Sequence, residues 1–304
     1  MSRKIAILAL LGCLAVTGNA ADMIELASGK TVKGTLAGRQ SIYVSLNLSE
    51  GASEAVVRLK PSEINRIHFS DSSERDEFLN RYSASDPYQA TVLLERLVRN
   101  RLPYMDLLSR SDELLFTMLL ESYIQSGRAE VALDRAKLWR TKLRSKDIID
   151  QIEELQIMAA TNTGDLDEAS FYSKRWIDSG KSARETALPW NTLAEDALAQ
   201  GAYESALWLS LNPIVFTHPH NPRFLANAYE IAIFSAYQLQ EFNYARQLHS
   251  EMMLRNLTWP IESERADVLV KLENLPSSPT LGRPGNPPPS HNPSPVLHKV
   301  AGKP

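Results

Sequence analysis

The chain has 304 residues, of which 43% are hydrophobic, and its formal net charge is −3 at pH 7. This length and hydrophobic content can supply the cores of two modest domains, so a chain that is disordered throughout is excluded. The net negative charge is concentrated in residues 71–275. Such a segment would repel phosphate backbones rather than collect them, so we expect no binding to nucleic acid.

The first 20 residues have the pattern of an export signal. Two basic residues, Arg3 and Lys4, precede an apolar run from Ile5 to Val16, and a small-residue cleavage site ends at Ala20. The run is too short to span a bilayer, which needs about 20 apolar residues. We therefore expect cleavage after Ala20 and a soluble periplasmic or secreted protein without a transmembrane span.

The only cysteine, Cys13, lies inside this signal, so the mature chain would contain no thiol and no disulfide. In an alternative interpretation, Leu10 to Cys13 form a bacterial lipobox, and Cys13 becomes a lipid-anchored first residue. The apolar run continues past Cys13 to Val16, whereas a lipoprotein usually becomes polar at this point. The sequence thus favours a cleaved leader over a lipid anchor.

Residues 21–70 alternate between apolar and polar side chains and are interrupted by turn residues, which predicts four or five short antiparallel strands. A single helical turn at Pro61–Ile64 and a last strand at Arg66–Phe69 complete this segment. A sheet this small would close into a β-barrel, because closure removes exposed strand edges. The strand order and the late helical turn resemble those of SH3-like or Sm-like barrels.

After residue 70 the hydrophobic period becomes that of helices, so residues 71–275 are predicted to form a helical domain and the fold class is α+β. The pairs Asp86-Pro87 and Asn221-Pro222 each predict a helix start. Residues 261–275 predict a closing helix. Residues 276–304 contain nine of the seventeen prolines and predict a disordered, solubilising tail.

A turn residue followed five positions later by alanine occurs four times in the helical domain. The pairs are Gly127/Ala132, Gly164/Ala169, Gly201/Ala206 and Gln240/Ala245, at spacings of 37, 37 and 39 residues. A period of this size indicates stacked helical hairpins, in which each hairpin buries its apolar face against its neighbours. Alanine suits the point where two helices of a hairpin cross closely.

These pairs, with the apolar residues two positions after each turn, resemble the tetratricopeptide repeat over residues 104–258. The residues after the turns are Ala129, Leu166, Tyr203 and Phe242. The spacing is longer than the usual repeat of about 34 residues, and another α-solenoid family would have the same period. The resemblance implies a non-enzymatic scaffold for protein–protein interaction.

The resemblance also implies that the first helix of each hairpin lines a peptide-binding groove. The residues expected to face this groove are Thr117, Glu121, Gln125, Glu154, Asn162, Asn191, Glu195, Asn227, Glu230, Phe234 and Tyr237. This set contains glutamates but no Lys or Arg, which favours a basic or neutral protein or peptide over an acidic one. Alternatively, the glutamates are simply a solvated helix face.

No sequence motif indicates catalysis, and we expect no metal and no cofactor. His218 and His220 supply two of the three or four ligands that zinc needs, and suit a surface loop better. Gly180-Lys181-Ser182 lacks the first glycine of a phosphate-binding loop and follows a predicted helix. The tryptophans are expected in the core rather than on a sugar-binding platform. They are Trp139, Trp176, Trp190, Trp208 and Trp259.

The sequence therefore favours an exported adaptor of the bacterial periplasm or envelope, in which the solenoid holds a peptide and the barrel contacts a second component. One alternative is an envelope glycan-binding protein or hydrolase with a site between the domains. Another is a structural scaffold that oligomerises through its end repeats. An enzyme should have a deep cavity with convergent acids, whereas an adaptor should have an open groove.

Overall fold

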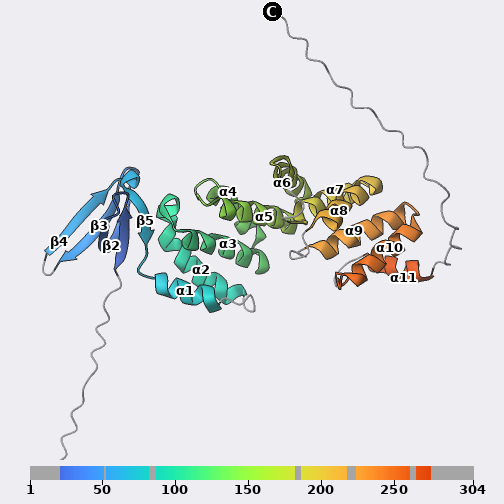
Figure 1. The fold of residues 1–304 in the computed structure, drawn as a ribbon, viewed down its shortest axis with the longest axis horizontal. Helices are drawn as coiled ribbons and strands as arrows, with labels where there is room; N and C mark the ends of the chain where they lie inside the picture. The colour runs from blue at the N-terminus through green and yellow to red at the C-terminus, as the bar shows by residue number, and fades with distance from the viewer. Residues whose placement is uncertain are drawn as a thin grey trace, which may run out of the picture.

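The computed structural model describes residues 21–50, 53–81, 87–181, 186–217, 224–260 and 265–274. In these residues a five-stranded antiparallel sheet is followed by a long series of helices, so the predicted α+β class is confirmed. Figure 1 shows an elongated arrangement, with the sheet at one end and α9 to α11 at the other. The predicted leader, the proline-rich tail and the His218/His220 pair lie outside the described residues.

The sheet has the strand order β4-β3-β2-β1-β5, and all neighbours are antiparallel. Its strands are β1 (Asp22–Leu26), β2 (Thr31–Arg39), β3 (Val44–Glu50), β4 (Ser53–Leu59) and β5 (Ile64–His68). The predicted helical turn before the last strand is the short helix η1 (Pro61–Glu63). Alternation along the strands buries one face, which includes Ile24, Leu46 and Ile67.

The two edges of this sheet are β4 and β5, and within the described residues no strand ladder joins them into a closed barrel. The helical part of the chain covers the core of the sheet instead. The short helix η2 (Leu102–Leu107) contributes Tyr104 and Leu107 to the same cluster as Ile24 and Ile67. The sheet and η2 therefore share one hydrophobic core, and the core of the first α-helices is a separate cluster.

A buried arginine holds this junction together. The Arg101 guanidinium donates from Nε to Asp112 Oδ1 and from Nη2 to Asp71 Oδ1, both at 2.7 Å. It also donates to the carbonyl of Leu97 at 2.8 Å and lies 4.5 Å from the centre of the Phe69 ring. A buried charge is tolerated only when it is paired and hydrogen-bonded, and Arg101 meets both conditions.

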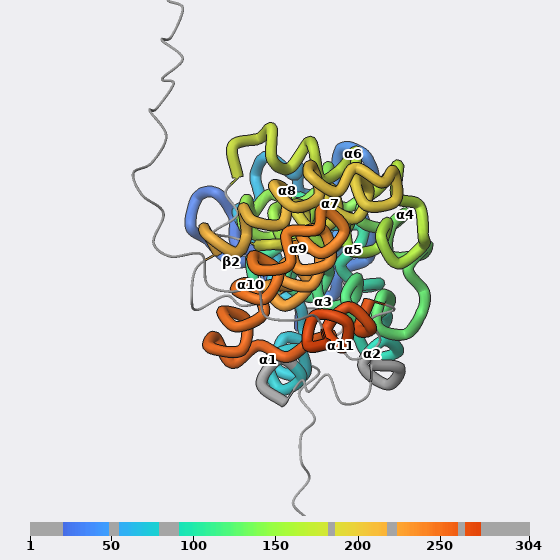
Figure 2. The backbone as a smooth tube through the Cα atoms, turned by 90° about the vertical axis from the view of Figure 1, so that its right-hand side faces the viewer, coloured from blue at the N-terminus to red at the C-terminus, as the bar shows by residue number. Residues whose placement is uncertain are grey.

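The helices form a succession of hairpins in which each helix contacts the next along the chain, from α3 to α10. Their bounds are α1 (Ser72–Arg81), α2 (Pro87–Arg101), α3 (Arg110–Gln125), α4 (Ala129–Trp139), α5 (Lys146–Thr163), α6 (Leu166–Asp178), α7 (Leu188–Ala199), α8 (Tyr203–Phe216), α9 (Leu225–Gln238), α10 (Phe242–Leu254) and α11 (Asp267–Asn274). The first helices α3, α5, α7 and α9 also contact one another in turn. In the end-on view of Figure 2, α5, α7 and α9 lie inside α4, α6 and α8.

The turns and alanines of the repeated motif lie where the sequence predicts them. The turn residues all have left-handed backbones, with φ of 75° at Gly127, 80° at Gly164, 71° at Gly201 and 63° at Gln240. The alanines on the second helices are all fully buried, at 1% exposure or less, and are Ala132, Ala169, Ala206 and Ala245. Close helix crossings therefore recur at the same point of each hairpin.

The three predicted helix starts differ in their outcome. Helix α2 begins at Pro87, as the sequence predicts, because proline fits the first helical position. Residue 222 lies outside the described residues, and α9 begins at Leu225 after Phe224, whose φ is 61°. The closing helix α11 begins at Asp267 rather than at residue 261, since residues 265 and 266 form a turn.

Candidate binding groove

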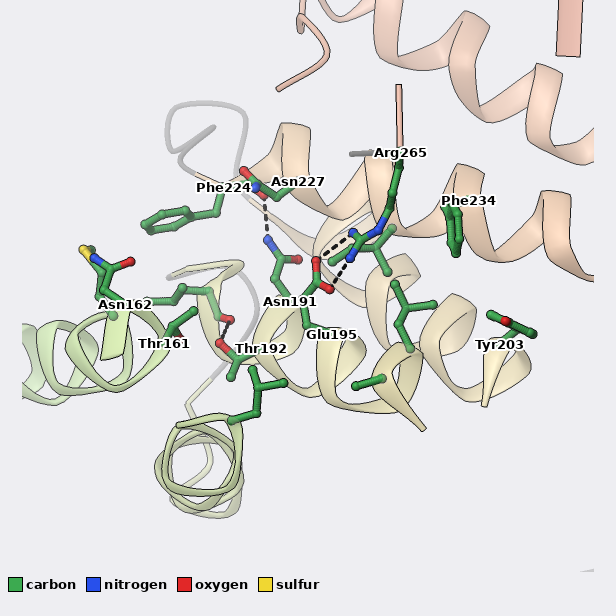
Figure 3. Close-up of a pocket in the computed structure, with 16 residues that line it drawn as sticks. Thr161, Asn162, Asn191, Thr192, Glu195, Tyr203, Phe224, Asn227, Phe234 and Arg265 are labelled. Atoms are coloured by element: carbon green, nitrogen blue, oxygen red, sulfur yellow. Dashed lines mark hydrogen bonds and ion pairs between the residues drawn. The ribbon is translucent and has the colours of Figure 1, made fainter. Parts of the chain in front are cut away.

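An open cavity of about 640 Å³ runs across the first helices of three consecutive hairpins (Figure 3). Helix α5 contributes Asn162, α7 contributes Asn191 and Glu195, and α9 contributes Asn227 and Phe234. Apolar residues of the same helices, such as Met158 and Leu198, complete much of the wall, and Leu166 of α6, Tyr203 of α8 and Phe224 before α9 also contribute. The helices that the repeat places side by side therefore form a continuous groove, which we call the α5–α9 groove.

Three asparagines provide neutral hydrogen-bonding groups along this groove, one from each first helix. Asn162 and Asn227 are exposed, whereas Asn191 is 5% exposed. The Asn191 amide donates from Nδ2 to the carbonyl of Phe224 at 2.8 Å, which fixes the orientation of the amide. Its Oδ1 atom has no hydrogen-bond partner within the described part of the chain. Each amide combines two donors and one acceptor, which suits a ligand with both kinds of group.

The charged part of the groove is an ion-pair cluster around Arg265, which lies just before α11. The Arg265 guanidinium contacts both carboxylate oxygens of Glu195, at 2.8 Å from Nη1 and 2.5 Å from Nη2. Nη1 also lies 3.3 Å from Glu230 Oε1, and the guanidinium carbon is 5.4 Å from the centre of the Phe234 ring. Two of the predicted glutamates therefore bind one arginine of the same chain.

Sequence reasoning missed Arg265 because it is 70 residues away from Glu195 and outside the four repeats. No periodic signal connects the two positions. The only hint in the sequence is the set of groove glutamates without a base, since acidic side chains gathered on one surface attract a cation from elsewhere in the fold.

The structure brings together six of the eleven predicted site residues. Five line the α5–α9 groove, and Glu230 joins them through Arg265; the five are Asn162, Asn191, Glu195, Asn227 and Phe234. The Tyr237 ring instead packs against Phe242, with 5.4 Å between the ring centres. Glu154 accepts a hydrogen bond from Thr186 Oγ1 at 3.1 Å and does not line the groove.

The three predicted residues on α3 also lie apart from this groove. Thr117 is buried, and its hydroxyl donates to the carbonyl of Leu114 at 2.9 Å. Glu121 is partly exposed and Gln125 is exposed. The observed groove is therefore shorter than the one that the resemblance implies, and it belongs to the later hairpins.

Most of the tryptophans are part of the packing. Trp139 and Trp176 are buried, Trp190 and Trp259 are partly buried, and only Trp208 is strongly exposed, at 65%. Within the described residues, no group of three or more His, Cys, Asp or Glu side chains could hold a metal ion. None of the described helices combines the length and the apolar character that a membrane span requires.

Lys181, whose sequence neighbourhood partly matches a phosphate-binding loop, forms ion pairs within its own chain. Lys181 Nζ lies 2.7 Å from Asp150 Oδ1 and 2.6 Å from Glu153 Oε2, over the face of the Trp176 ring. Burial by itself lowers the pKa of Lys181, but the two carboxylates outweigh burial and raise it above its ordinary value. Lys181 is thus engaged by its own chain.

Comparison with known proteins adds no assignment, because no protein family and no curated protein matches this chain. The geometry of the α5–α9 groove is therefore the basis for a functional proposal.

Proposed function

We propose that the protein is an exported, non-enzymatic adaptor that binds a peptide or protein segment in the α5–α9 groove. The observation that carries this proposal is the position of the groove, which crosses the first helices of three successive hairpins. A tetratricopeptide-like solenoid presents this surface to its ligands, and the left-handed turns and buried alanines support that assignment.

The chemistry of the groove suits an extended polypeptide. A peptide offers alternating N–H and C=O groups, and the groove offers neutral amides at Asn162, Asn191 and Asn227 together with apolar side chains such as Leu198 and Phe234. Its volume of about 640 Å³ lies within the range for ligand sites of a few hundred to about 1,000 Å³. An acidic partner is disfavoured because Arg265, the cation in the described lining, is already engaged by Glu195 and Glu230, and this favours a basic or neutral partner.

The charges in this groove favour binding over catalysis. Its lining contains one carboxylate, Glu195, and one guanidinium, Arg265, and these two groups neutralise each other. General acid–base chemistry would instead need convergent titratable groups with displaced pKa values. A glycan platform in this groove is also disfavoured, because its described lining contains no tryptophan.

The other parts of the chain fit the same role. The leader before residue 21 would deliver the protein to the periplasm or the cell exterior. The five-stranded sheet, fixed to α2 and α3 through Arg101, would present a second binding surface at the opposite end from α9. The adaptor could then connect two components of the envelope.

A groove-filling substitution tests this function. Ala199 is exposed and lines the groove, so Ala199→Trp adds an indole there while the core stays intact. Ser205→Trp places the same side chain on an exposed site of α8 outside the groove lining and is the matched control. A phage-displayed peptide library is selected on the mature wild-type protein, and the dissociation constants of the enriched peptides are measured.

We expect enriched peptides to lose at least about tenfold in affinity on Ala199→Trp and to bind Ser205→Trp like the wild type. A selection that enriches no peptide, or peptides that bind both variants equally, would exclude the groove as the binding site.

A further inference from the structure

Arg265 lies in a complete binding site for a guanidinium group, which we call the guanidinium site and which consists of Glu195, Glu230 and Phe234. Figure 3 shows Arg265 extending into the groove toward Glu195, with Phe234 beside it. Glu195 engages both terminal nitrogens, Glu230 adds a second carboxylate, and the Phe234 ring provides a cation–π contact. The Glu230 side chain is 8% exposed, so part of this site is strongly desolvated.

The three residues of the guanidinium site come from the hairpins, whereas Arg265 does not. Glu195 is on α7, and Glu230 and Phe234 are on α9, two helices that contact each other directly. Arg265 belongs to the turn before α11, which is anchored separately by Val268 and Leu272 in the core formed by α9 and α10. The anchor of α11 therefore does not depend on the Arg265 side chain, so α11 and the guanidinium site could stay in place when that side chain leaves Glu195.

An empty guanidinium site would be unfavourable, because Glu195 would line the groove without the guanidinium that pairs with both of its oxygens. A second arginine, supplied by a ligand in the same groove, would restore the contacts that Arg265 makes. We propose that the groove recognises an arginine-bearing peptide, whose guanidinium displaces Arg265 from Glu195 and Glu230. This inference rests on the proposed function and names the side chain that the site selects.

The geometry selects arginine over lysine. The guanidinium is a planar fork that can meet two oxygens of one carboxylate, reach a second carboxylate and present a face to an aromatic ring. A lysine ammonium is a point charge and cannot make the paired contacts seen at Glu195 together with the contact at Glu230. Citrulline has nearly the same shape as arginine but carries no charge, so it should not displace Arg265.

Competition from Arg265 has a measurable consequence. A tethered side chain acts at an effective concentration in the millimolar range, so the wild type should bind arginine peptides more weakly than a variant without this competitor. Arg265 would then outcompete weak ligands for the guanidinium site. A peptide that also contacts other parts of the α5–α9 groove would bind tightly enough to displace it.

The test uses three acetylated and amidated pentapeptides, Ala-Ala-X-Ala-Ala, in which X is arginine, lysine or citrulline. Isothermal titration calorimetry measures their binding to the mature wild type, to Arg265→Ala, and to Arg265→Ala combined with Glu195→Gln. We expect Arg265→Ala to bind the arginine peptide on the order of tenfold more tightly than the wild type does. The same variant should bind the lysine peptide more weakly than the arginine peptide. The citrulline peptide should not bind, and Glu195→Gln should abolish the gain.

A second measurement remains informative if Arg265→Ala is unstable. Ethylguanidinium should raise the melting temperature of Arg265→Ala and leave that of the Glu195→Gln double variant unchanged, because only the former retains the guanidinium site. Equal binding of the arginine and citrulline peptides, or no stabilisation by ethylguanidinium, overturns the inference. If the library selection yields groove-binding peptides without arginine, the inference fails while the adaptor function stands; if it yields no peptides, the function itself fails.

Discussion

The buried guanidinium of Arg101 should be one of the most important side chains for stability. Arg101→Met keeps most of the side-chain length but removes the charge and every donor. The Arg101 side chain is 0% exposed and Asp112 is 1% exposed, so their hydrogen bond is fully protected from water. Removing one partner of a buried ion pair costs about 3 to 5 kcal/mol when the other charge is left uncompensated. Asp112 keeps a second bond from Arg75 Nη1 at 2.7 Å, so we expect a loss near the lower end of this range. This is a large part of a typical unfolding free energy of about 5 to 15 kcal/mol.

Urea denaturation followed by tryptophan fluorescence measures this effect on the mature chain. The control is Arg110→Met, which removes an arginine from an exposed pair with Asp147, in which the side chains are 66% and 47% exposed. Exposed pairs contribute little, because water and salt screen them, so this variant should unfold at the same urea concentration as the wild type. If Arg101→Met and Arg110→Met have equal stability, the argument that Arg101 ties the sheet to the helices is refuted.

The same cluster predicts a dependence on pH. Burial by itself raises the pKa of the Asp112 carboxyl, but hydrogen bonds and charges from Ser109, Arg101 and Arg75 outweigh it and hold the pKa below its ordinary value. The unfolded chain therefore binds this proton first as pH falls. The stability that Asp112 contributes is complete above the unfolded value of about 3.9 and is lost as pH falls through the folded value. The stability difference between the wild type and Asp112→Asn should accordingly shrink below about pH 4 in urea titrations.

Three further substitutions test the repeat architecture through unfolding free energies. Gly164 has φ of 80° and open space where a Cβ would stand, so Gly164→Ala should cost about 1 kcal/mol through backbone strain alone; unchanged stability would contradict the left-handed turn. Gln240 adopts φ of 63° without being glycine, so Gln240→Gly should stabilise by up to about 1 kcal/mol, and a loss would show that its side chain matters more than its backbone. Ala206 is 0% exposed and lies in one cluster with Ala194 and Ile231. Ala206→Leu should therefore cost about 1 to 3 kcal/mol of unfolding free energy by overpacking. Unchanged stability would exclude a close helix crossing at this point.

The parts of the fold that the sequence predicts well are those set by local chemistry. Alternation gives the strands, and proline marks the start of α2. Glycine at the turns and alanine five positions later give the hairpins, because both residues are needed by geometry at those points. The turn at Gln240 is predictable only because the period requires a turn there, since glutamine by itself does not indicate a positive φ.

The parts that the sequence misses depend on contacts between distant segments. Arg101 is a charged helix residue, which by sequence alone is expected at the surface. Only the folded chain brings Asp71 and Asp112 around it. Tyr104 belongs by sequence to the helical part, yet it fills the core of the sheet. Arg265, from outside the four repeats, pairs with Glu195 and Glu230. No period or propensity encodes these long-range pairings.

The most direct test of the central claim locates a bound peptide on the protein. A peptide selected on the wild type is titrated into the isotopically labelled mature chain, and NMR follows the side-chain amide signals of Asn162, Asn191 and Asn227. We predict that these three signals shift together and saturate with the dissociation constant measured for that peptide, because the amides line one groove. Saturable shifts confined to the five-stranded sheet or to α3, with these amides unchanged, would contradict the assignment of the α5–α9 groove as the binding site.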